Sequence, residues 1–122
     1  LFTDAHNRYF VEERNHVGEG VIDAKGKVIL PCKYNRLRYC SAGRYIEETD
    51  DPLGTTRLID EQGNILVTAT DYTLKRSAHH GLIVILTEAD PNVGLINENG
   101  VVVVQPQYTY IDRFVDLSHP ED

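Results

Sequence analysis

Apolar and polar residues follow one block pattern that occurs three times along the chain. Residues 20–31 read GVIDAKGKVILP, residues 57–68 read RLIDEQGNILVT and residues 94–105 read GLINENGVVVVQ. The glycine that closes each polar block stands at positions 26, 63 and 100, so 63 − 26 and 100 − 63 both give a period of 37 residues. A fixed period of this size is typical of repeat proteins, in which each unit packs on its neighbours.

Each polar block has the composition of a β-turn. It begins with Asp or Asn, whose side chain can accept hydrogen bonds from the following backbone, and it ends with Gly. Glycine at this place suits a type I turn that closes in a G1 bulge. The sequence therefore predicts three β-hairpins, with turns at residues 23–26, 60–63 and 97–100.

The apolar runs beside these turns predict strands. Residues 28–30, 65–67 and 102–104 are short and rich in β-branched side chains. Because they do not alternate with polar residues, we expect them to be buried on both faces or nearly so. Two apolar residues also precede each turn, and we expect all of them to share one core. These pairs are Val21-Ile22, Leu58-Ile59 and Leu95-Ile96.

Further elements flank each hairpin. Residues 8–12, 44–48 and 82–86 predict one more strand before each hairpin. After the hairpins come Tyr34-x-x-Leu37 and Tyr108-x-x-Ile111-x-x-Phe114. A spacing of three predicts a single helical or 3₁₀ turn that tucks its apolar residues under the sheet.

These elements predict an all-β domain of three β-hairpin repeats, each about 37 residues long. We expect a twisted antiparallel meander or a partly closed barrel. A β-trefoil is the alternative, but it needs a fourth strand per repeat that the pattern does not place. We expect one domain over residues 1–122, with copies at approximately 8–43, 44–80 and 81–114, in what is part of a longer chain.

The repeat resembles the WG (KWG) repeat family of bacterial β-rich proteins. The shared pattern is G-[VL]-I-[DN]-x-x-G-x-V-[IV]-[LV]-P, followed by Tyr-x-x-Leu or Tyr-x-x-Ile. The family's Trp-Gly pair is degenerate, because these positions read Glu19-Gly20, Thr56-Arg57 and Val93-Gly94. What the resemblance implies is a non-enzymatic repeat module.

The charge is acidic overall and unevenly placed. The net charge is −7, yet every charged residue from 24 to 46 is basic, and the acidic run 47–51 follows directly. An acidic surface repels nucleic acid and anionic membranes and attracts basic partners, so we expect a basic protein partner and neither of the other two. The candidate partner-binding residues are Glu47, Glu48, Asp50, Asp51, Glu88 and Asp90.

No enzyme, cofactor or metal is expected. The chain contains no P-loop, no G-x-S-x-G and no H-E-x-x-H motif, and it offers no catalytic residue. Two cysteines, Cys32 and Cys40, are too few for a zinc site, and we expect buried free thiols.

The function predicted from these observations is a non-catalytic protein–protein interaction module that binds through an acidic repeat surface. One alternative is an immunity protein that neutralises a basic bacterial toxin. Another is a lectin-like carbohydrate-binding domain, which requires exposed aromatic platforms. We expect a cytoplasmic protein, with periplasmic or secreted locations left open because the chain starts at Leu1 and contains no Met.

Overall fold

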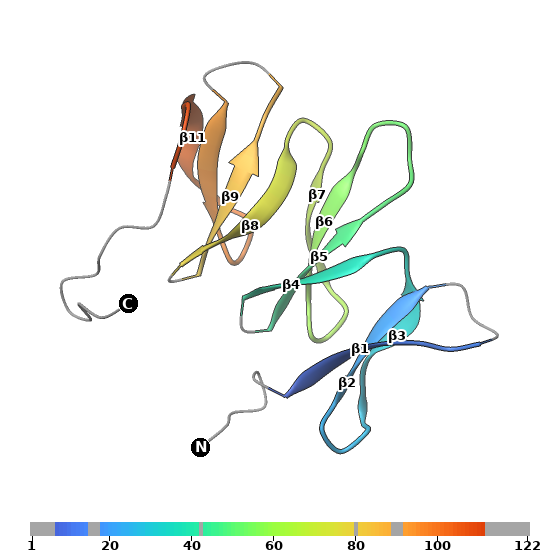
Figure 1. Cartoon of the computed structure of the whole chain (residues 1–122). Coiled ribbons are helices and arrows are strands. Elements are labelled where there is room, and N and C mark those ends of the chain that lie inside the picture. The colour runs from blue at the N-terminus through green and yellow to red at the C-terminus, as the bar shows by residue number, and fades with distance from the viewer. Residues whose placement is uncertain (1–6, 15–17, 42, 80, 89–91, 112–122) are drawn as a thin grey trace, which may run out of the picture.

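The computed structural model of the chain describes residues 7–14, 18–41, 43–79, 81–88 and 92–111. They form eleven strands in three antiparallel sheets, and no helix occurs among them (Figure 1). The first sheet contains β1 (Arg8–Glu12), β2 (Glu19–Asp23) and β3 (Val28–Tyr34). The middle sheet contains β4 (Leu37–Ser41), β5 (Arg44–Glu48), β6 (Thr56–Asp60) and β7 (Ile65–Ala69). The last sheet contains β8 (Thr73–His79), β9 (Leu82–Leu86), β10 (Val93–Asn97) and β11 (Val102–Tyr108).

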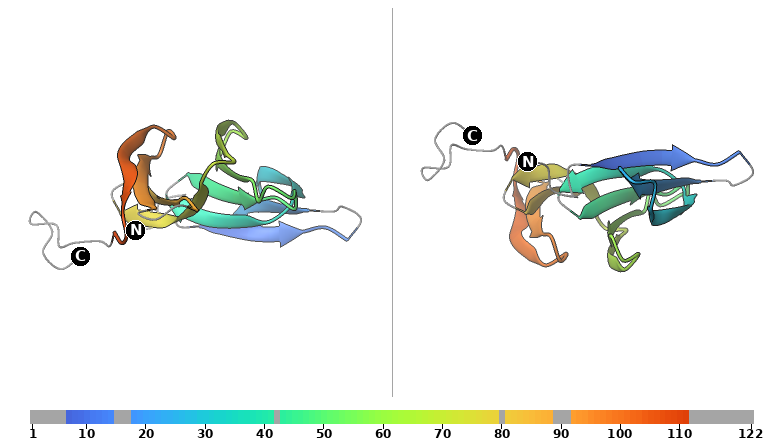
Figure 2. Two further views of the ribbon diagram at one scale, coloured as in Figure 1. Left: turned by 90° about the horizontal axis from the view of Figure 1, so that it is seen from above. Right: turned by 90° about the horizontal axis from the view of Figure 1, so that it is seen from below.

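The predicted meander is confirmed. Strands that follow one another in the chain lie side by side within each sheet, and the described strands close no barrel. The middle sheet lies between the other two (Figure 1), and the strands of the last sheet stand at an angle to those of the first (Figure 2).

The three hairpin turns form as predicted. In the first, Gly26 N donates to Asp23 O at 3.0 Å, and Asp23 Oδ1 accepts from the amides of Lys25 and Lys27, both at 2.9 Å. Asp60 and Asn97 make the same bonds in the other two turns. The closing glycines have φ between 83° and 88°, a conformation that favours Gly over other residues.

The paired apolar residues before each turn point to opposite faces of their sheet, since side chains alternate along a strand. We call the face toward the next sheet in the chain the forward face, and the opposite one the backward face. Three residues in register across neighbouring strands form an apolar row on each face. The forward rows are Phe10–Val21–Leu30, Ile46–Leu58–Val67 and Val84–Leu95–Val104. The backward rows are Tyr9–Ile22–Val28, Tyr45–Ile59–Ile65 and Ile83–Ile96–Val102.

The structure has two hydrophobic cores, so the prediction of one shared core is wrong. One core lies between the first and middle sheets and joins Val21 and Leu30 to Tyr45 and Ile59. The other lies between the middle and last sheets and contains Leu58 and Ile96, with further buried neighbours. Because successive apolar residues face opposite ways, the middle sheet supplies one face to each core. Ile59 and Ile96 therefore occupy equivalent buried places, whereas Ile22 is only half-buried.

The prediction that the strands after the turns are buried on both faces is also wrong. Val28 is 60% exposed, Ile65 is 55% exposed and Val103 is 49% exposed. The reason is that β3, β7 and β11 are the edge strands of their sheets, so the neighbouring sheet covers only part of each strand. Leu30, in the middle of β3, is covered.

The predicted helical turn at Tyr34-x-x-Leu37 is wrong as well. Tyr34 ends β3 in the first sheet and Leu37 begins β4 in the middle sheet. Both side chains are buried in the core between those two sheets, which explains their spacing. In the third copy Tyr108 ends β11, and Phe114 lies outside the described residues.

The boundaries of the sequence repeats therefore differ from the boundaries of the sheets by one strand. The strand that directly follows β3 belongs to the middle sheet, and the strand that follows β7 belongs to the last sheet. These two strands, β4 and β8, are the fourth strands that the sequence pattern did not place. The first sheet has only three strands among the described residues.

Glycine follows the degenerate Trp position where the backbones of two strands approach closely. A Cβ atom on Gly20 would lie 2.5 Å from Leu30 O, and one on Gly94 would lie 2.5 Å from Val104 O. In both sheets the pairing register shifts at this point, as in a β-bulge. The middle sheet has no shift there, since Arg57 pairs with Thr68 in regular register, and it therefore tolerates a side chain.

Two arginines connect the start of one sheet to the turn of the next. Arg8 begins β1 and forms an ion pair with Glu61 in the β6–β7 turn, at 2.8 Å. Arg44 begins β5 and donates from Nε to Glu98 O in the β10–β11 turn, at 2.7 Å. Leu82 stands at the matching register position of β9 and cannot form this clamp.

A second connection comes from the positions at which the WG pattern carries Trp. Glu19 Oε1 accepts from the Leu37 amide at 2.7 Å, and Thr56 Oγ1 accepts from the Leu74 amide at 3.1 Å. In each case the bond joins one sheet to the first strand of the next. A hydrogen-bond acceptor thus stands at the Trp position in two copies, while Val93 in the third has no polar side-chain atom.

Candidate functional site

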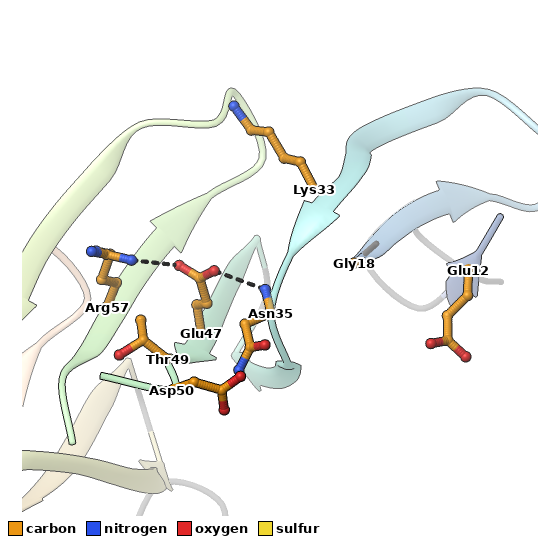
Figure 3. A pocket seen from close by; sticks show the side chains of 8 residues that line it. All are labelled: Glu12, Gly18, Lys33, Asn35, Glu47, Thr49, Asp50 and Arg57. Carbon is orange, nitrogen blue, oxygen red and sulfur yellow. Dashed lines mark hydrogen bonds and ion pairs between the residues drawn. The ribbon is translucent and has the colours of Figure 1, made fainter. Parts of the chain in front are cut away.

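Two pockets open where neighbouring sheets meet. The first pocket, of about 440 Å³, lies between the first and middle sheets and is lined by residues that include Glu12, Lys33, Glu47, Asp50 and Arg57. Figure 3 shows Glu47 between Arg57 and Asn35, with Asp50 nearby and Glu12 on the far side. The pocket walls come from the ends of four strands that two sheets contribute.

The second pocket, of about 540 Å³, lies between the middle and last sheets. Its lining includes Leu53, Asp71, Tyr72, Thr87 and Glu88. It is the repeat-related counterpart of the first pocket. Thr49 and Thr87 directly follow equivalent strands, and their amides donate to the carbonyls of Thr55 and Asn92 at 3.1 and 2.8 Å. The same edge of the molecule therefore presents two pockets built in the same way.

Glu47 and Glu48 have partners within the protein. Glu47 is 7% exposed, its Oε1 lies 3.1 Å from Arg57 Nη1, and its Oε2 accepts from the Asn35 amide at 2.9 Å. Glu48 is half-buried and lies 3.2 Å from Arg38 Nε and 3.8 Å from Arg36 Nη1. Both carboxylates thus hold strands together.

Asp51 also serves the local structure. Its Oδ1 accepts from the Thr55 amide at 3.0 Å and closes the β5–β6 loop. Hydrogen bonds from Thr55 lower the pKa of this carboxyl below its usual value.

Asp50 and Glu88 are the predicted residues that remain exposed in the pockets. Asp50 lines the first pocket and Glu88 the second, and neither makes a hydrogen bond or ion pair with the described part of the chain. The structure therefore does not bring the five described residues of the predicted six together in one place. Asp90 lies outside the described residues.

The sequence prediction missed two acidic residues of the pockets. Glu12 is exposed in the first pocket and Asp71 is exposed in the second. Glu12 belongs to the first sheet and Asp50 follows β5 of the middle sheet, whereas Asp71 precedes β8 and Glu88 follows the neighbouring strand β9. Superposing the three copies on their turn glycines would have placed the ends of β1 and β7 at this edge. The charge runs alone did not indicate it.

The remaining candidates occupy other parts of the molecule. Both cysteines are thiols as expected, but only Cys40 is buried, in the second core, whereas Cys32 is half-buried and its Sγ lies 3.6 Å from Val11 O. No cluster of three or more metal-ligating side chains occurs within the described ranges. Tyr39 and Tyr108 are about half exposed, so exposed aromatic side chains of the kind that a lectin uses are present. The described part of the chain holds no helix with the length and apolar character that a membrane crossing requires.

Comparison with known proteins gives one result. The family model described as WG containing repeat matches residues 20–46 and 94–116. The first match covers most of β2 through the start of β5, and the second begins in β10. No curated protein and no solved structure matches the chain. Two stretches of the chain therefore match the WG repeat, and neither contains a tryptophan.

Proposed function

We propose that this chain is a non-catalytic protein-binding module, and that its acidic edge binds a basic segment of a protein partner. The acidic edge is defined by Glu12 and Asp50 in the first pocket and by Asp71 and Glu88 in the second. The proposal rests on one observation. Each pocket carries two exposed carboxylates, and none of the four has a hydrogen bond or ion pair with the described residues.

The acidic residues fall into two groups, those bonded within the protein and those exposed to solvent, and this difference supports the proposal. Glu47, Glu48 and Asp51 are already bonded to neighbouring strands and loops, so they offer little to a partner. The acidic edge, in contrast, faces solvent, where carboxylates attract cations over roughly one Debye length of about 10 Å at 0.1 M salt. With a net charge of −7, the whole chain adds to this attraction.

The repeated geometry indicates the kind of partner. Two similar pockets at successive sheet junctions can take two basic side chains from one extended segment. Lys33 of the first sheet and Arg57 of the middle sheet also line the first pocket, and their positive charges disfavour a partner with strong positive charge there. A mixed segment with spaced Lys or Arg residues therefore fits better than a continuous basic run.

A more specific form of this proposal is an immunity protein that neutralises a basic bacterial toxin. It uses the same acidic edge, and rim charges of this kind mainly increase the association rate. The same charge disfavours nucleic acid and anionic membranes as partners.

The test uses fluorescent peptides that carry two Lys or Arg residues at varied spacing, with acidic peptides of equal length as controls. We expect binding to the basic peptides that weakens steeply between about 50 and about 500 mM salt. Asp50→Asn and Glu88→Gln should each weaken binding about two- to fivefold, in line with about 0.5–1 kcal/mol for an exposed charge pair.

Glu98→Gln provides the matched control, because Glu98 is an exposed acid in the β10–β11 turn, at the opposite end of its hairpin from Glu88. It should leave binding unchanged. Binding that does not depend on salt, or that Glu98→Gln reduces as much as Glu88→Gln does, would overturn the role of the acidic edge.

A further inference from the structure

One edge strand of the described sheets lacks the residues that usually prevent a further strand from adding to it. The edge strands of the three sheets are β1, β3, β4, β7, β8 and β11. All of them except β7 contain a proline or a charged side chain, the usual protection of a sheet edge. β7 reads ILVTA and contains neither. It belongs to the middle sheet, which has a described sheet on either side (Figure 1).

The backbone of Thr68 faces the free edge of β7. Asp60 N donates to Asn64 O at 3.1 Å across the β6–β7 hairpin. Backbone groups alternate in direction along an antiparallel strand, so Asp60 and Leu58 both bond toward β7. Arg57 lies between them and bonds toward β5, and its register partner is Thr68. The N–H and C=O of Thr68 therefore point away from β6, to the side on which β7 has no described neighbour.

The equivalent strand of the first sheet is protected at the same position. Pro31 precedes Thr68 by one period, since 68 − 31 gives 37, and it has no N–H to offer to another strand. Lys33 adds an exposed charge two residues later in β3. In the last sheet, β11 contains Pro106. The repeat therefore does not require an open edge, and β7 is the edge to which a partner strand can add.

The side chains beside this edge fit an extended segment with β-branched residues. Ile65 is 55% exposed, although the other two residues of its backward row are fully buried. Thr68 is exposed as well. On the opposite face, Gly100 of the β10–β11 turn already lies against Val67. A strand beside β7 therefore gains its new side-chain contacts on the backward face, next to Ile65 and Thr68.

The carboxyl end of β7 leads into the second pocket. β7 ends at Ala69, and residues 70–73 are part of the lining of that pocket. A segment that runs along β7 past Thr68 therefore approaches Asp71 and Glu88, the two exposed carboxylates of the acidic edge at this pocket. The described lining of the second pocket contains no basic residue, in contrast to that of the first. A cation that enters it is attracted without opposing charge from the pocket.

We propose that an extended segment of a protein partner adds to the free edge of β7 as a fifth strand of the middle sheet, with a basic side chain in the second pocket. This inference rests on the proposed function and adds backbone pairing to it. Antiparallel pairing, which all the described strand pairs use, places the amino end of the segment at the carboxyl end of β7. The partner segment therefore carries Lys or Arg on the amino-terminal side of a run of β-branched residues.

A second copy of the chain is a poorer occupant of this edge. Pairing of β7 with β7 would bring together two molecules that each carry a net charge of −7. Like charges of this size oppose association, whereas a basic segment is attracted.

The first test uses a fluorescent peptide in which two lysines precede alternating valine and threonine residues. Two further versions carry backbone N-methyl groups, one on the valines and the other on the threonines. Only one of these versions loses the N–H groups that face β7. We expect that version to bind about tenfold more weakly than the other, as the loss of one or two backbone hydrogen bonds implies. Equal binding of the two versions would overturn strand addition.

The second test changes the protein. Thr68→Pro removes the N–H that faces the edge and should weaken binding of the unmethylated peptide by a similar factor. Thr68→Val keeps this N–H and is the matched control, so it should bind like the unmodified chain. Circular dichroism should show that both variants fold. Peptide binding by Thr68→Pro that equals binding by Thr68→Val would contradict the proposal.

Hydrogen exchange of the Thr68 amide in the unmodified chain gives a measurement that needs no variant. The amide should exchange rapidly in the chain alone and slowly once the peptide is bound. Slow exchange that develops with rising protein concentration, without peptide, would show pairing between two copies and would overturn the proposal.

Failure of the proposed function gives a different result from failure of strand addition. Salt-dependent peptide binding that is the same for both N-methyl versions keeps the acidic edge as a binding surface and removes only the pairing with β7. Binding that distinguishes the two versions but does not change with salt or in Glu88→Gln keeps the pairing and removes the role of the acidic edge.

Discussion

Arg8 and Glu61 form a two-point ion pair across 53 residues of sequence. Arg8 Nε lies 2.8 Å from Glu61 Oε2, and Arg8 Nη2 lies 3.0 Å from Glu61 Oε1. The two side chains are only 10% and 19% exposed. The pair joins β1 of the first sheet to the β6–β7 turn of the middle sheet, so it stabilises the contact between these two sheets.

Glu61→Gln should lower the free energy of unfolding by about 1.5–3 kcal/mol, the usual contribution of a hydrogen bond to a charged group. The hydrogen bond from Arg8 is the main cause that lowers the pKa of Glu61 below its ordinary value of 4.5. A lowered folded-state pKa gives stability that is complete above the unfolded-state pKa and is lost as the pH falls through the folded-state pKa. Urea titrations measure the free energy of unfolding of Glu61→Gln and of the unmodified chain. The difference between the two should be largest at neutral pH and smaller at about pH 3.

Glu98→Gln is the control for this prediction. Glu98 has the equivalent turn position in the last sheet, but Arg44 bonds to its backbone carbonyl and not to its carboxylate. Its substitution should leave stability unchanged at both pH values. An equal loss of unfolding free energy in both variants would show that the negative charge of the turn, and not the ion pair, explains the effect.

Tyr45→Phe should test the buried phenol in the same cluster. The Tyr45 hydroxyl donates to Glu61 Oε2 at 2.8 Å, and its side chain is 0% exposed. Removing the hydroxyl should cost about 1 kcal/mol while the ring packing stays. Burial, and then the bond to Glu61, raises the pKa of Tyr45 above 10.

Because its pKa is raised, Tyr45 should stabilise the fold less at alkaline pH. The stability that the neutral phenol contributes is present below the unfolded-state pKa and is lost as the pH rises toward the folded-state value. The advantage of the unmodified chain over Tyr45→Phe should therefore decrease above about pH 10. Tyr9→Phe is the control for the loss of a hydroxyl, because Tyr9 is 53% exposed and its ring is not enclosed by a core.

Thr56→Val should weaken the connection between the middle and last sheets. Thr56 is 4% exposed, and its hydroxyl is the acceptor for the Leu74 amide. Valine has nearly the same shape but leaves this buried amide without a partner, at a cost of about 1–3 kcal/mol. Thr68→Val is the control, because Thr68 is an exposed residue of β7. Chemical denaturation should show a lower free energy of unfolding for Thr56→Val and an unchanged one for Thr68→Val.

Gly20→Ala should be strongly destabilising, because the new Cβ would lie 2.5 Å from Leu30 O, well inside van der Waals contact. Crowding of this kind costs about 1–3 kcal/mol or forces the strand to shift. The repeat-equivalent Arg57 already carries a Cβ, because the regular register of the middle sheet leaves room for one there. Thermal denaturation of Gly20→Ala should show a lower midpoint than that of the unmodified chain, and an unchanged midpoint would contradict the close approach.

The parts of the fold that depend on neighbouring residues could be predicted from sequence. Asp23 and Gly26 define a turn through bonds that span only a few residues, and the repeat places two further turns with it. The same locality explains the correct prediction of strands beside each turn. Predictions that require knowing which strand lies at a sheet edge were wrong, since the exposure of Val28 depends on pairing partners far away in the sequence.

The candidate site shows the same limit. Glu47 and Asp50 are close neighbours in sequence and equally acidic, yet one is buried against Arg57 while the other faces the pocket. Their difference arises from the contact between the first and middle sheets. Glu12 was not identified because its wall of the pocket comes from a different copy of the repeat, and only the spatial arrangement brings the two walls together.

The one-strand offset between sequence repeat and sheet has a consequence for how such proteins can change length. The strand that follows one sheet in the sequence is the first strand of the next sheet. A duplicated stretch of 37 residues therefore adds the strands of one complete sheet, wherever in the repeat the duplication begins. Recombination between copies would not need to respect any particular boundary. Loss of a stretch of the same size would be equally harmless to the remaining junctions, so lineages of this protein should differ by whole multiples of the period.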